Sequence, residues 1–233
     1  MKVHRFFIEQ KINEKQEIVV KEKNLINQWK NVLRLKTGGS VILFDGGDFE
    51  FQCVIENLSK DGAKFSVVEK RKVEQSIKFE LELFPAFIKK DRFEWILEKG
   101  VELGVKKFSP IISERSIKQK INLERSRKII KEAAEQSGKN MLAEISEPRI
   151  LSEVIKNRAS DIFYFALDPR GEKFSLEKIR FNKAGVFIGP EGGFAQKEIE
   201  SFKNNDIPVY SLGNQILRTE TAAISITAKI LLN

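Results

Sequence analysis

Short apolar runs alternate with amphipathic helical stretches over the last two thirds of the chain, and this alternation constrains the fold most. Apolar runs of this length, bounded by turn residues, are typical of buried parallel strands. The expected strands are 78–87, 108–112, 161–167, 185–189 and 208–212, and the expected helices are 89–104, 122–138, 151–157, 196–204 and 220–232. Because such alternation produces a mostly parallel sheet covered by helices on both faces, an α/β fold is predicted.

The first 72 residues show a different pattern, with short strand candidates separated by turn residues. The expected strands are 3–9, 17–20, 40–45, 49–57 and 64–69, and apolar residues recur at helical spacing over 25–34. A small β-barrel with one helix fits this pattern. The basic, polar stretch 70–76 is expected to connect two domains, at 1–72 and 73–233.

Composition limits the chemistry that the chain can perform. Its 233 residues include one His and one Cys, which are too few for a Cys/His zinc site, so no metal is expected. A nucleophile pair of Cys53 and His4 is arithmetically possible, but Cys53 falls in a strand-like stretch, where an inert buried thiol is the expected state. With no signal peptide and no apolar run of membrane length, a cytoplasmic protein without a membrane partner is predicted.

The charge of the chain favours a polyanionic partner. Lys and Arg number 41 against 33 Asp and Glu, which gives a formal net charge of +8. This balance favours RNA or DNA ahead of an anionic membrane, and it is equally compatible with a lysine-rich, solvated surface.

Two glycine-containing segments follow strands near the C-terminus. Gly189-Pro-Glu-Gly-Gly-Phe194 follows one apolar run, and Leu212-Gly-Asn-Gln-Ile-Leu-Arg-Thr-Glu-Thr-Ala222 follows another. Ligands of open α/β sheets bind where strands end at their carboxyl side, and glycine lets the backbone approach a ligand closely. The two segments therefore predict a small-molecule pocket built largely of main chain. The first segment alone also fits a tight strand-to-helix turn, because it lacks the spacing of a nucleotide-binding motif.

The second segment carries several polar residues at the start of the last expected helix. Thr219 is expected to be the N-cap, and Glu220 in the first turn complements the helix dipole. Capping does not explain Arg218, Asn214 or Gln215, which are therefore candidates for a functional role.

Taken together, the two segments resemble the closing pattern of the SPOUT superfamily of knotted methyltransferases. More narrowly, the chain resembles the 16S rRNA (uracil-1498-N3)-methyltransferase family, nearly from end to end. The other stretches that carry the resemblance are 4–7, 32–34, 43–46, 102–105, 110, 114–116 and 132–137. Three positions depart from the family's pattern, because Lys139 and Gln215 stand where Arg is common and Ala143 stands where Pro is usual. Lys cannot reproduce the planar, bidentate fork of Arg, so contacts with RNA or across a dimer would differ there.

The resemblance implies the fold and the cofactor. It implies a C-terminal SPOUT-type knotted α/β domain with a mostly parallel sheet and a trefoil knot, preceded by a small PUA-like β-barrel. It also implies that S-adenosylmethionine binds among the loops that follow three strands. The cofactor-binding residues implied in this way are Leu167, Gly189, Pro190, Glu191, Gly192, Gly193, Leu212, Gly213, Asn214, Ile216, Leu217 and Arg218.

The implied reaction is methylation of N3 of a specific uridine in 16S rRNA of the small ribosomal subunit. Uridine N3 carries a proton that has to leave, which calls for a general base or for a cation that stabilises the uridine anion. Arg218 is expected to stabilise or orient that anion, and Glu220 is expected to act as the base, with Glu191 as the second candidate. Because N3 lies on the pairing edge, the target base has to be unpaired or turned out of its stack.

The resemblance also implies partners. The barrel is expected to bind RNA through Arg5, Lys30, Arg34 and Lys36, and the enzyme is expected to be a homodimer. Two alternatives stay open at this point. One is a ribose 2′-O-methyltransferase of the same superfamily, and the other is a catalytically silent RNA-binding factor of ribosome assembly.

Overall fold

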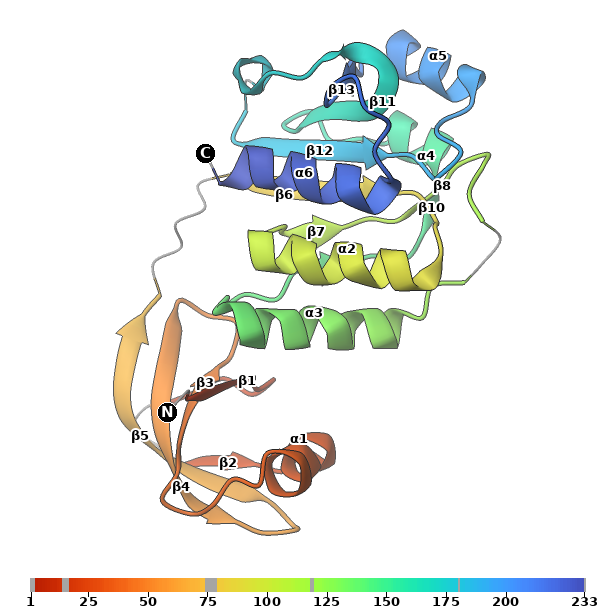
Figure 1. The fold of residues 1–233 in the computed structure, drawn as a ribbon. Helices are drawn as coiled ribbons and strands as arrows, with labels where there is room; N and C mark the ends of the chain where they lie inside the picture. The colour runs from red at the N-terminus through yellow and green to blue at the C-terminus, as the bar shows by residue number, and fades with distance from the viewer. Residues whose placement is uncertain (1–2, 14–16, 74–78, 118–119, 180, 233) are drawn as a thin grey trace. The chain divides into compact units, whose positions relative to one another are not determined.

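The structure, a computed structural model, describes residues 3–13, 17–73, 79–117, 120–179 and 181–232. The chain divides into two units, of which the first comprises residues 1–76 with 134–141 and the second comprises residues 77–133 with 142–233 (Figure 1). The helix α3 (Leu123–Ser137) therefore begins in the second unit and ends in the first.

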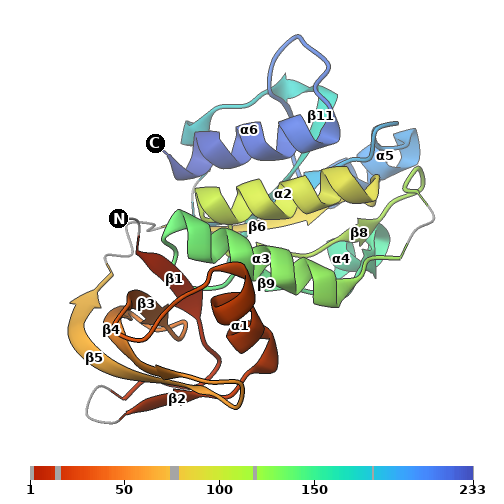
Figure 2. The same ribbon diagram turned by 60° about the horizontal axis from the view of Figure 1, so that its bottom comes forward.

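A five-stranded sheet forms most of the first unit (Figure 2). Its strands are β1 (His4–Phe7), β2 (Ile18–Val20), β3 (Ser40–Phe44), β4 (Phe49–Leu58) and β5 (Ala63–Lys72), in the order β1-β3-β4-β5-β2. Neighbouring strands are antiparallel except for the parallel pair of β1 and β3. β5 is longer than predicted, because its ladder with β4 continues until Lys72 lies opposite Phe49. The start of the expected connection, 70–72, therefore belongs to the sheet, and 74–76 lie outside the described residues.

The helix predicted over 25–34 is present as α1 (Lys23–Asn27), followed by one π-helical turn, η1 (Gln28–Val32). Trp29 of this turn is buried and packs edge-on against Phe6 of β1 and Phe65 of β5. These contacts fix the helix on one face of the sheet. Cys53 of β4 is buried as well, and burial raises the pKa of its thiol to about 12. The expected burial of this thiol is thus confirmed.

A six-stranded sheet organises the second unit (Figure 1). Its strands are β6 (Glu80–Pro85), β7 (Lys107–Phe108), β9 (Glu144–Ile145), β11 (Phe163–Lys173), β12 (Lys183–Ile188) and β13 (Val209–Ser211), in the order β13-β11-β12-β6-β7-β9. Every neighbouring pair in this sheet is parallel. The predicted α/β class with a mostly parallel sheet is confirmed.

The single strand predicted at 108–112 is wrong, because this stretch contributes to two sheets. β7 belongs to the six-stranded sheet, whereas β8 (Ile111–Ile112) pairs with β10 (Arg149–Ile150) in a separate two-stranded sheet. Ser109 and Pro110 separate the two short strands. β9 and β10 were not predicted, since two residues are too few to show a period.

Helices cover both faces of the six-stranded sheet. α2 (Lys90–Leu103) and α6 (Thr219–Leu231) lie side by side on one face in both views (Figures 1 and 2). On the other face, α4 (Leu151–Lys156) and α5 (Gln196–Asn204) pack into a hydrophobic cluster with the rings of Phe84, Tyr164 and Phe187. A 3₁₀ turn, η2 (Leu176–Lys178), lies between β11 and β12. None of the helices in the described part of the chain is long and apolar enough to cross a bilayer.

Candidate cofactor-binding site

A cavity of about 410 Å³ lies at the carboxyl ends of β12 and β13 and beside the middle of β11, the strand between them. Its lining consists of residues 167–170, 188–193, 210–212 and 215–219, with Arg115 and Ala222. This volume falls in the range of small-molecule pockets. The two glycine-containing segments that were expected to share a pocket do line the same cavity.

Ten of the twelve residues implied as cofactor-binding line this cavity, and the other two, Gly213 and Asn214, do not. The hydroxyl of Ser211 donates to the carbonyl oxygen of Gly213 at 2.7 Å and accepts from its N–H at 3.2 Å. These bonds fold the loop after β13 back on itself, and the following residues, from Gln215 onward, return to the cavity. Gln215, one of the positions that depart from the family pattern, is thus part of the lining.

Apolar side chains form part of the cavity wall. Leu167 lies in the middle of β11, Ile188 is the last residue of β12, and Leu217 comes from the loop after β13. Ile216, beside Leu217, is 88 % exposed. A ligand in the cavity would therefore remove apolar surface of Ile216 from water, which is favourable.

A bulge in β11 shapes the cavity next to Leu167. Tyr210 of β13 lies opposite Leu167 and again opposite Glu172, so that the four residues 168–171 leave the ladder between them. Gly171 passes so close to β13 that a Cβ atom there would lie 2.5 Å from the carbonyl oxygen of Val209. Bulges are common beside functional sites because they re-aim side chains, and this one directs Asp168 and Arg170 to the cavity.

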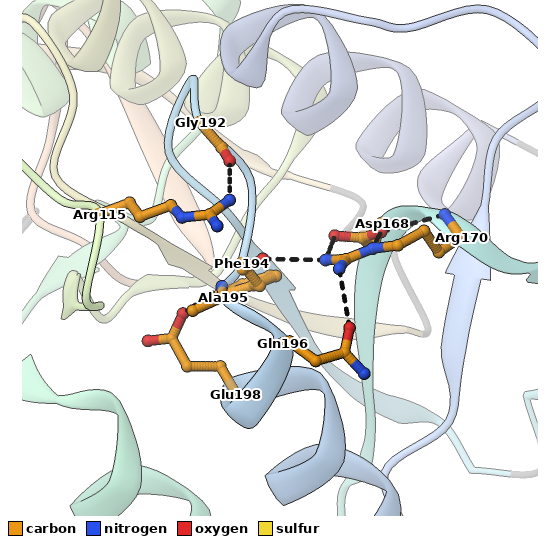
Figure 3. A network of polar contacts seen from close by, with 8 residues as sticks. All are labelled: Arg115, Asp168, Arg170, Gly192, Phe194, Ala195, Gln196 and Glu198. Atoms are coloured by element: carbon orange, nitrogen blue, oxygen red, sulfur yellow. Dashed lines mark hydrogen bonds and ion pairs between the residues drawn. The ribbon is translucent and has the colours of Figure 1, made fainter.

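The guanidinium group of Arg170 connects the bulge to the start of α5 (Figure 3). Its Nε and Nη2 donate to the two carboxylate oxygens of Asp168 at 2.7 and 2.9 Å. Nη2 also donates to the carbonyl oxygen of Phe194 at 2.8 Å, and Nη1 donates to Oε1 of Gln196 at 3.2 Å. Burial of Asp168 opposes ionisation of its carboxyl, but the hydrogen bonds from Arg170 outweigh that effect and hold the pKa of Asp168 below its usual value.

Further contacts hold the glycine loop after β12. Nη1 of Arg115 donates to the carbonyl oxygen of Gly192 at 2.7 Å (Figure 3). Gly193 has a φ of +66°, which favours glycine. The carboxylate of Glu198 accepts the N–H of Ala195 at 2.8 Å, and this bond defines the beginning of α5. The path of the loop is therefore set by side chains from several elements.

Thr219 holds the same loop from the other side, and its predicted role as N-cap of α6 is wrong. Arg218 occupies the N-cap position, without a side-chain capping bond. Thr219 is the first residue of the helix, and its buried hydroxyl donates to the carbonyl oxygen of Gly189 at 3.0 Å. The carbonyl at the end of β12 offers this hydroxyl an acceptor that local sequence cannot reveal.

The residues predicted to be catalytic occupy different positions. Arg218 lines the cavity, whereas Glu220 is 8 % exposed and does not. Oε1 of Glu220 lies 3.7 Å from Nε of Arg92, and its Oε2 is buried without a hydrogen-bond partner. Nη1 of Arg92 also donates to Oε1 of Glu191 at 3.1 Å, and Glu191 does line the cavity. Arg92 of α2 thus connects both candidate bases.

The predicted RNA-binding residues lie in the first unit. Arg34 and Lys36 are exposed and Lys30 is half-buried. Arg5 differs from them, because its guanidinium group donates to Glu50 and, at 2.9 Å, to Oδ1 of Asn140. These bonds give Arg5 a structural role within the first unit.

Several residues of the site escaped the sequence analysis. The missed residues are Arg92, Arg115, Asp168, Pro169, Arg170, Ile188, Tyr210, Ser211 and Ala222. Turn residues directly after an expected strand, Asp168-Pro-Arg-Gly171, were a signal for part of this set. Across the described residues, no group of three or more His, Cys, Asp or Glu side chains is arranged to hold a metal ion.

Comparison with known proteins agrees with this architecture. A family described as RNA methyltransferase domain matches residues 75–231, and one described as RNA methyltransferase PUA domain matches residues 30–68. The chain is 31 % identical to the ribosomal RNA small subunit methyltransferase E of Rickettsia conorii, over 99 % of this chain and 96 % of that protein. It is 30 % identical to the Bacillus subtilis protein of the same name, over 83 % of this chain and 82 % of that protein.

Two solved structures with bound cofactor are similar over nearly their whole length. One is a ribosomal RNA small subunit methyltransferase E from Neisseria gonorrhoeae bound to S-adenosyl methionine, with a TM-score of 0.90 at 26 % identity, over 98 % of this chain and 97 % of that one. The other is a methyltransferase from Legionella pneumophila in complex with the same cofactor, with a TM-score of 0.88 at 27 % identity, over 99 % and 97 %. The expected fold class, a SPOUT-type α/β domain preceded by a PUA-like barrel, is confirmed by these matches.

Proposed function

The chain belongs to the RNA methyltransferase domain family, and on this premise we propose that it methylates N3 of a specific uridine in 16S ribosomal RNA, with S-adenosylmethionine as the methyl donor. The observation that supports the proposal most is the cavity of about 410 Å³, which is lined by the β11 bulge and by the loops after β12 and β13. The chain is also similar over nearly its whole length to two structures with this cofactor bound.

The residues of the cavity fit S-adenosylmethionine. The cofactor supplies a methyl group on a sulfonium, which is a strong electrophile without help from the protein. Main-chain groups of 189–193 and 210–212 would hold its polar parts, and Leu167, Ile216 and Leu217 would contact its apolar surface. The protein then has to place the acceptor nitrogen in line with the methyl group and remove its proton.

We assign to Arg218 the stabilisation of the uridine anion. Arg218 lines the cavity, and its planar guanidinium group presents several N–H donors to an anionic oxygen. For the base, the geometry favours Glu191, because Glu191 lines the cavity and Glu220 does not. Glu220, the first candidate from the sequence, becomes the second, and it stays a candidate since its buried Oε2 lacks a hydrogen-bond donor.

Single-turnover methylation of small-subunit RNA with saturating cofactor tests these roles. We expect Arg218→Ala to lower the rate roughly 100-fold or more, as losses of anion stabilisers do. We expect Glu191→Gln to lower the rate of methylation by about 100-fold and to change how that rate depends on pH. Glu102→Gln is the control, because Glu102 is a carboxylate near the end of α2 that pairs with Lys99 and does not line the cavity. Wild-type rates for Arg218→Ala would overturn its assignment.

Mapping of the product by mass spectrometry of nucleosides tests the reaction itself. A methyl group on uridine N3 supports the proposal, and a methyl group on ribose O2′ contradicts it. Absence of S-adenosylmethionine binding by the wild-type protein would instead indicate a silent RNA-binding factor.

The proposed substrate implies further properties. Lys30, Arg34 and Lys36 would contact RNA phosphates, and their contribution would weaken as salt rises. Arg5 is not part of this proposed surface, because its guanidinium group already has partners within its own unit. An enzyme of this family acting on ribosomal RNA would work in the cytoplasm, and we expect it to be a homodimer.

A further inference from the structure

The bulge in β11 brings to the cavity an ion pair between Arg170 and the buried Asp168, and the proposed chemistry does not use this pair. Asp168 is buried, and each of its carboxylate oxygens accepts a hydrogen bond from the guanidinium group of Arg170. Oδ1 also accepts the backbone N–H of Arg170 at 3.0 Å. The carboxylate therefore has its donors from within the protein, and it does not need a ligand to satisfy it.

The same guanidinium group reaches a second cavity loop. Beyond Asp168, it donates to the carbonyl oxygen of Phe194 and to the side chain of Gln196 (Figure 3). Phe194 and Gln196 directly follow the glycine loop, residues 189–193, which lines the cavity. The guanidinium group of Arg170 thus connects the bulge of β11 with the segment that follows the glycine loop. Such a fork of donors is specific to Arg, because an ammonium group cannot bond these acceptors at once in the same geometry.

The position of the bulge is defined on its other side as well. Tyr210 of β13 pairs with β11 both before and after the bulge. The close approach of Gly171 to Val209 leaves no room for movement toward β13. The bulge is therefore held between β13 and the residues after the glycine loop, and Arg170 supplies the second of these two attachments.

We propose that Arg170 is a positioning residue for the cofactor: it clamps the β11 bulge to the start of α5 and so fixes the main-chain groups that line the cavity before the ligand enters. Binding to a pre-formed site avoids the cost of ordering its loops, so the clamp contributes to affinity without touching the reacting atoms. The inference rests on the proposed function for the identity of the ligand, S-adenosylmethionine.

Arg158 provides a matched control at the other end of the same helix. Its Nη1 donates to the carbonyl oxygen of Ile155 at 2.7 Å, and its Nη2 donates to that of Asn205 at 2.5 Å. Arg158 therefore clamps the C-terminal end of α5, where Arg170 clamps the beginning. Arg158 does not line the cavity. Replacing either arginine removes a clamp of α5, but only one of the two clamps borders the proposed cofactor site.

The test compares Arg170→Lys and Arg158→Lys in the full chain. Titration calorimetry measures the Kd of S-adenosylmethionine, and steady-state kinetics separates KM for the cofactor from kcat. We expect Arg170→Lys to raise Kd and KM about 10-fold, as the loss of charge-assisted hydrogen bonds would, with kcat at saturating cofactor within about 2-fold of wild type. We expect Arg158→Lys to leave Kd unchanged, although the melting temperature falls in both variants.

Two outcomes overturn the inference: wild-type affinity in Arg170→Lys, or an equal loss of affinity in Arg158→Lys. If Arg170→Lys does not fold, Gln196→Ala serves instead, because it removes one bond of the clamp and leaves Asp168 paired. A rise in Kd of about 3-fold then supports the clamp, and an unchanged Kd overturns it. Failure of the wild-type protein to bind the cofactor would contradict the proposed function itself, which separates the two results.

Discussion

The amino and carboxyl ends of the six-stranded sheet both carry charged side chains, but these side chains have different partners. At the amino ends, lysines pair with carboxylates, as in the pair of Lys107 and Glu82 at 3.2 Å and that of Lys183 and Asp161 at 2.9 Å. Lys107, Glu82 and Lys183 line a hollow of about 120 Å³. Near the carboxyl ends, Arg170 also pairs with a carboxylate, that of Asp168, but Arg115 and Arg170 in addition donate to the backbone carbonyl oxygens of Gly192 and Phe194.

This difference shows that charged side chains can either pair with each other or hold the backbone. A pair of exposed side chains leaves the backbone free and contributes little to stability, because water competes for both partners. A guanidinium group on a carbonyl oxygen instead fixes the main chain, which here forms a cavity about three times larger than the hollow at the other end. The predictions below test whether the carboxyl end is the sensitive one.

The largest effect is expected for Gly171→Ala at the carboxyl end. The new Cβ would lie 2.5 Å from the carbonyl oxygen of Val209, and a backbone neighbour cannot move aside cheaply. We expect a loss of roughly 3 kcal/mol in the free energy of unfolding, together with a loss of cofactor binding. Chemical denaturation followed by far-ultraviolet circular dichroism measures the stability. Gly192→Ala is the control for stability alone, because its Cβ would make an ordinary contact at 3.4 Å with Arg115, whereas Gly192 itself lines the cavity.

The next effect is expected for Asp168→Asn, and it depends on pH. Because the pKa of Asp168 is lowered in the folded protein, its contribution is present above the ordinary value of 3.8 and is lost as the pH falls through the lowered pKa. We expect the variant to be less stable by about 2 kcal/mol at pH 7, since a charge-assisted pair is lost. The difference from wild type should shrink below about pH 4 in denaturation curves recorded across pH. A difference that stays constant down to pH 2 would contradict this role.

A smaller effect is expected for Thr219→Val. The variant lacks the hydrogen bond to the carbonyl oxygen of Gly189, and we expect a loss of about 1 kcal/mol with a weaker affinity for S-adenosylmethionine. Thr227→Val on the same helix is the control, because its hydroxyl donates to the carbonyl oxygen of Ala223 within α6. Denaturation should show a loss of stability in both variants. Calorimetric titration should show a weaker affinity for the cofactor only in Thr219→Val. Equal affinities would show that Thr219 acts on the fold alone.

The smallest effect is expected at the amino end, for Lys183→Ala. Its partner Asp161 is exposed, so the pair is screened by water and by salt. We expect no measurable change in melting temperature or in cofactor affinity. A clear loss of affinity in this variant would abolish the contrast between the two ends of the sheet.

Local patterns were enough to predict most elements and the place of the cavity. The periods of the apolar residues identified most of the longer strands and helices, because each period reflects which side of one element is buried. The same reasoning placed Gly189 and Arg218 at strand exits, where they line one cavity. Two-residue strands such as β9 were missed, since so short a ladder leaves no local period.

The sequence by itself therefore determined the α/β class, the order of the main elements and the loops that meet at the cavity. Only the tertiary structure decided which side chains hold those loops. Arg92 and Glu191 are separated by 99 positions along the chain, and Arg115 and Gly192 by 77. Periodicity arises from the geometry of a single helix or strand, whereas a hydrogen bond between distant segments depends on how the whole sheet brings their ends together.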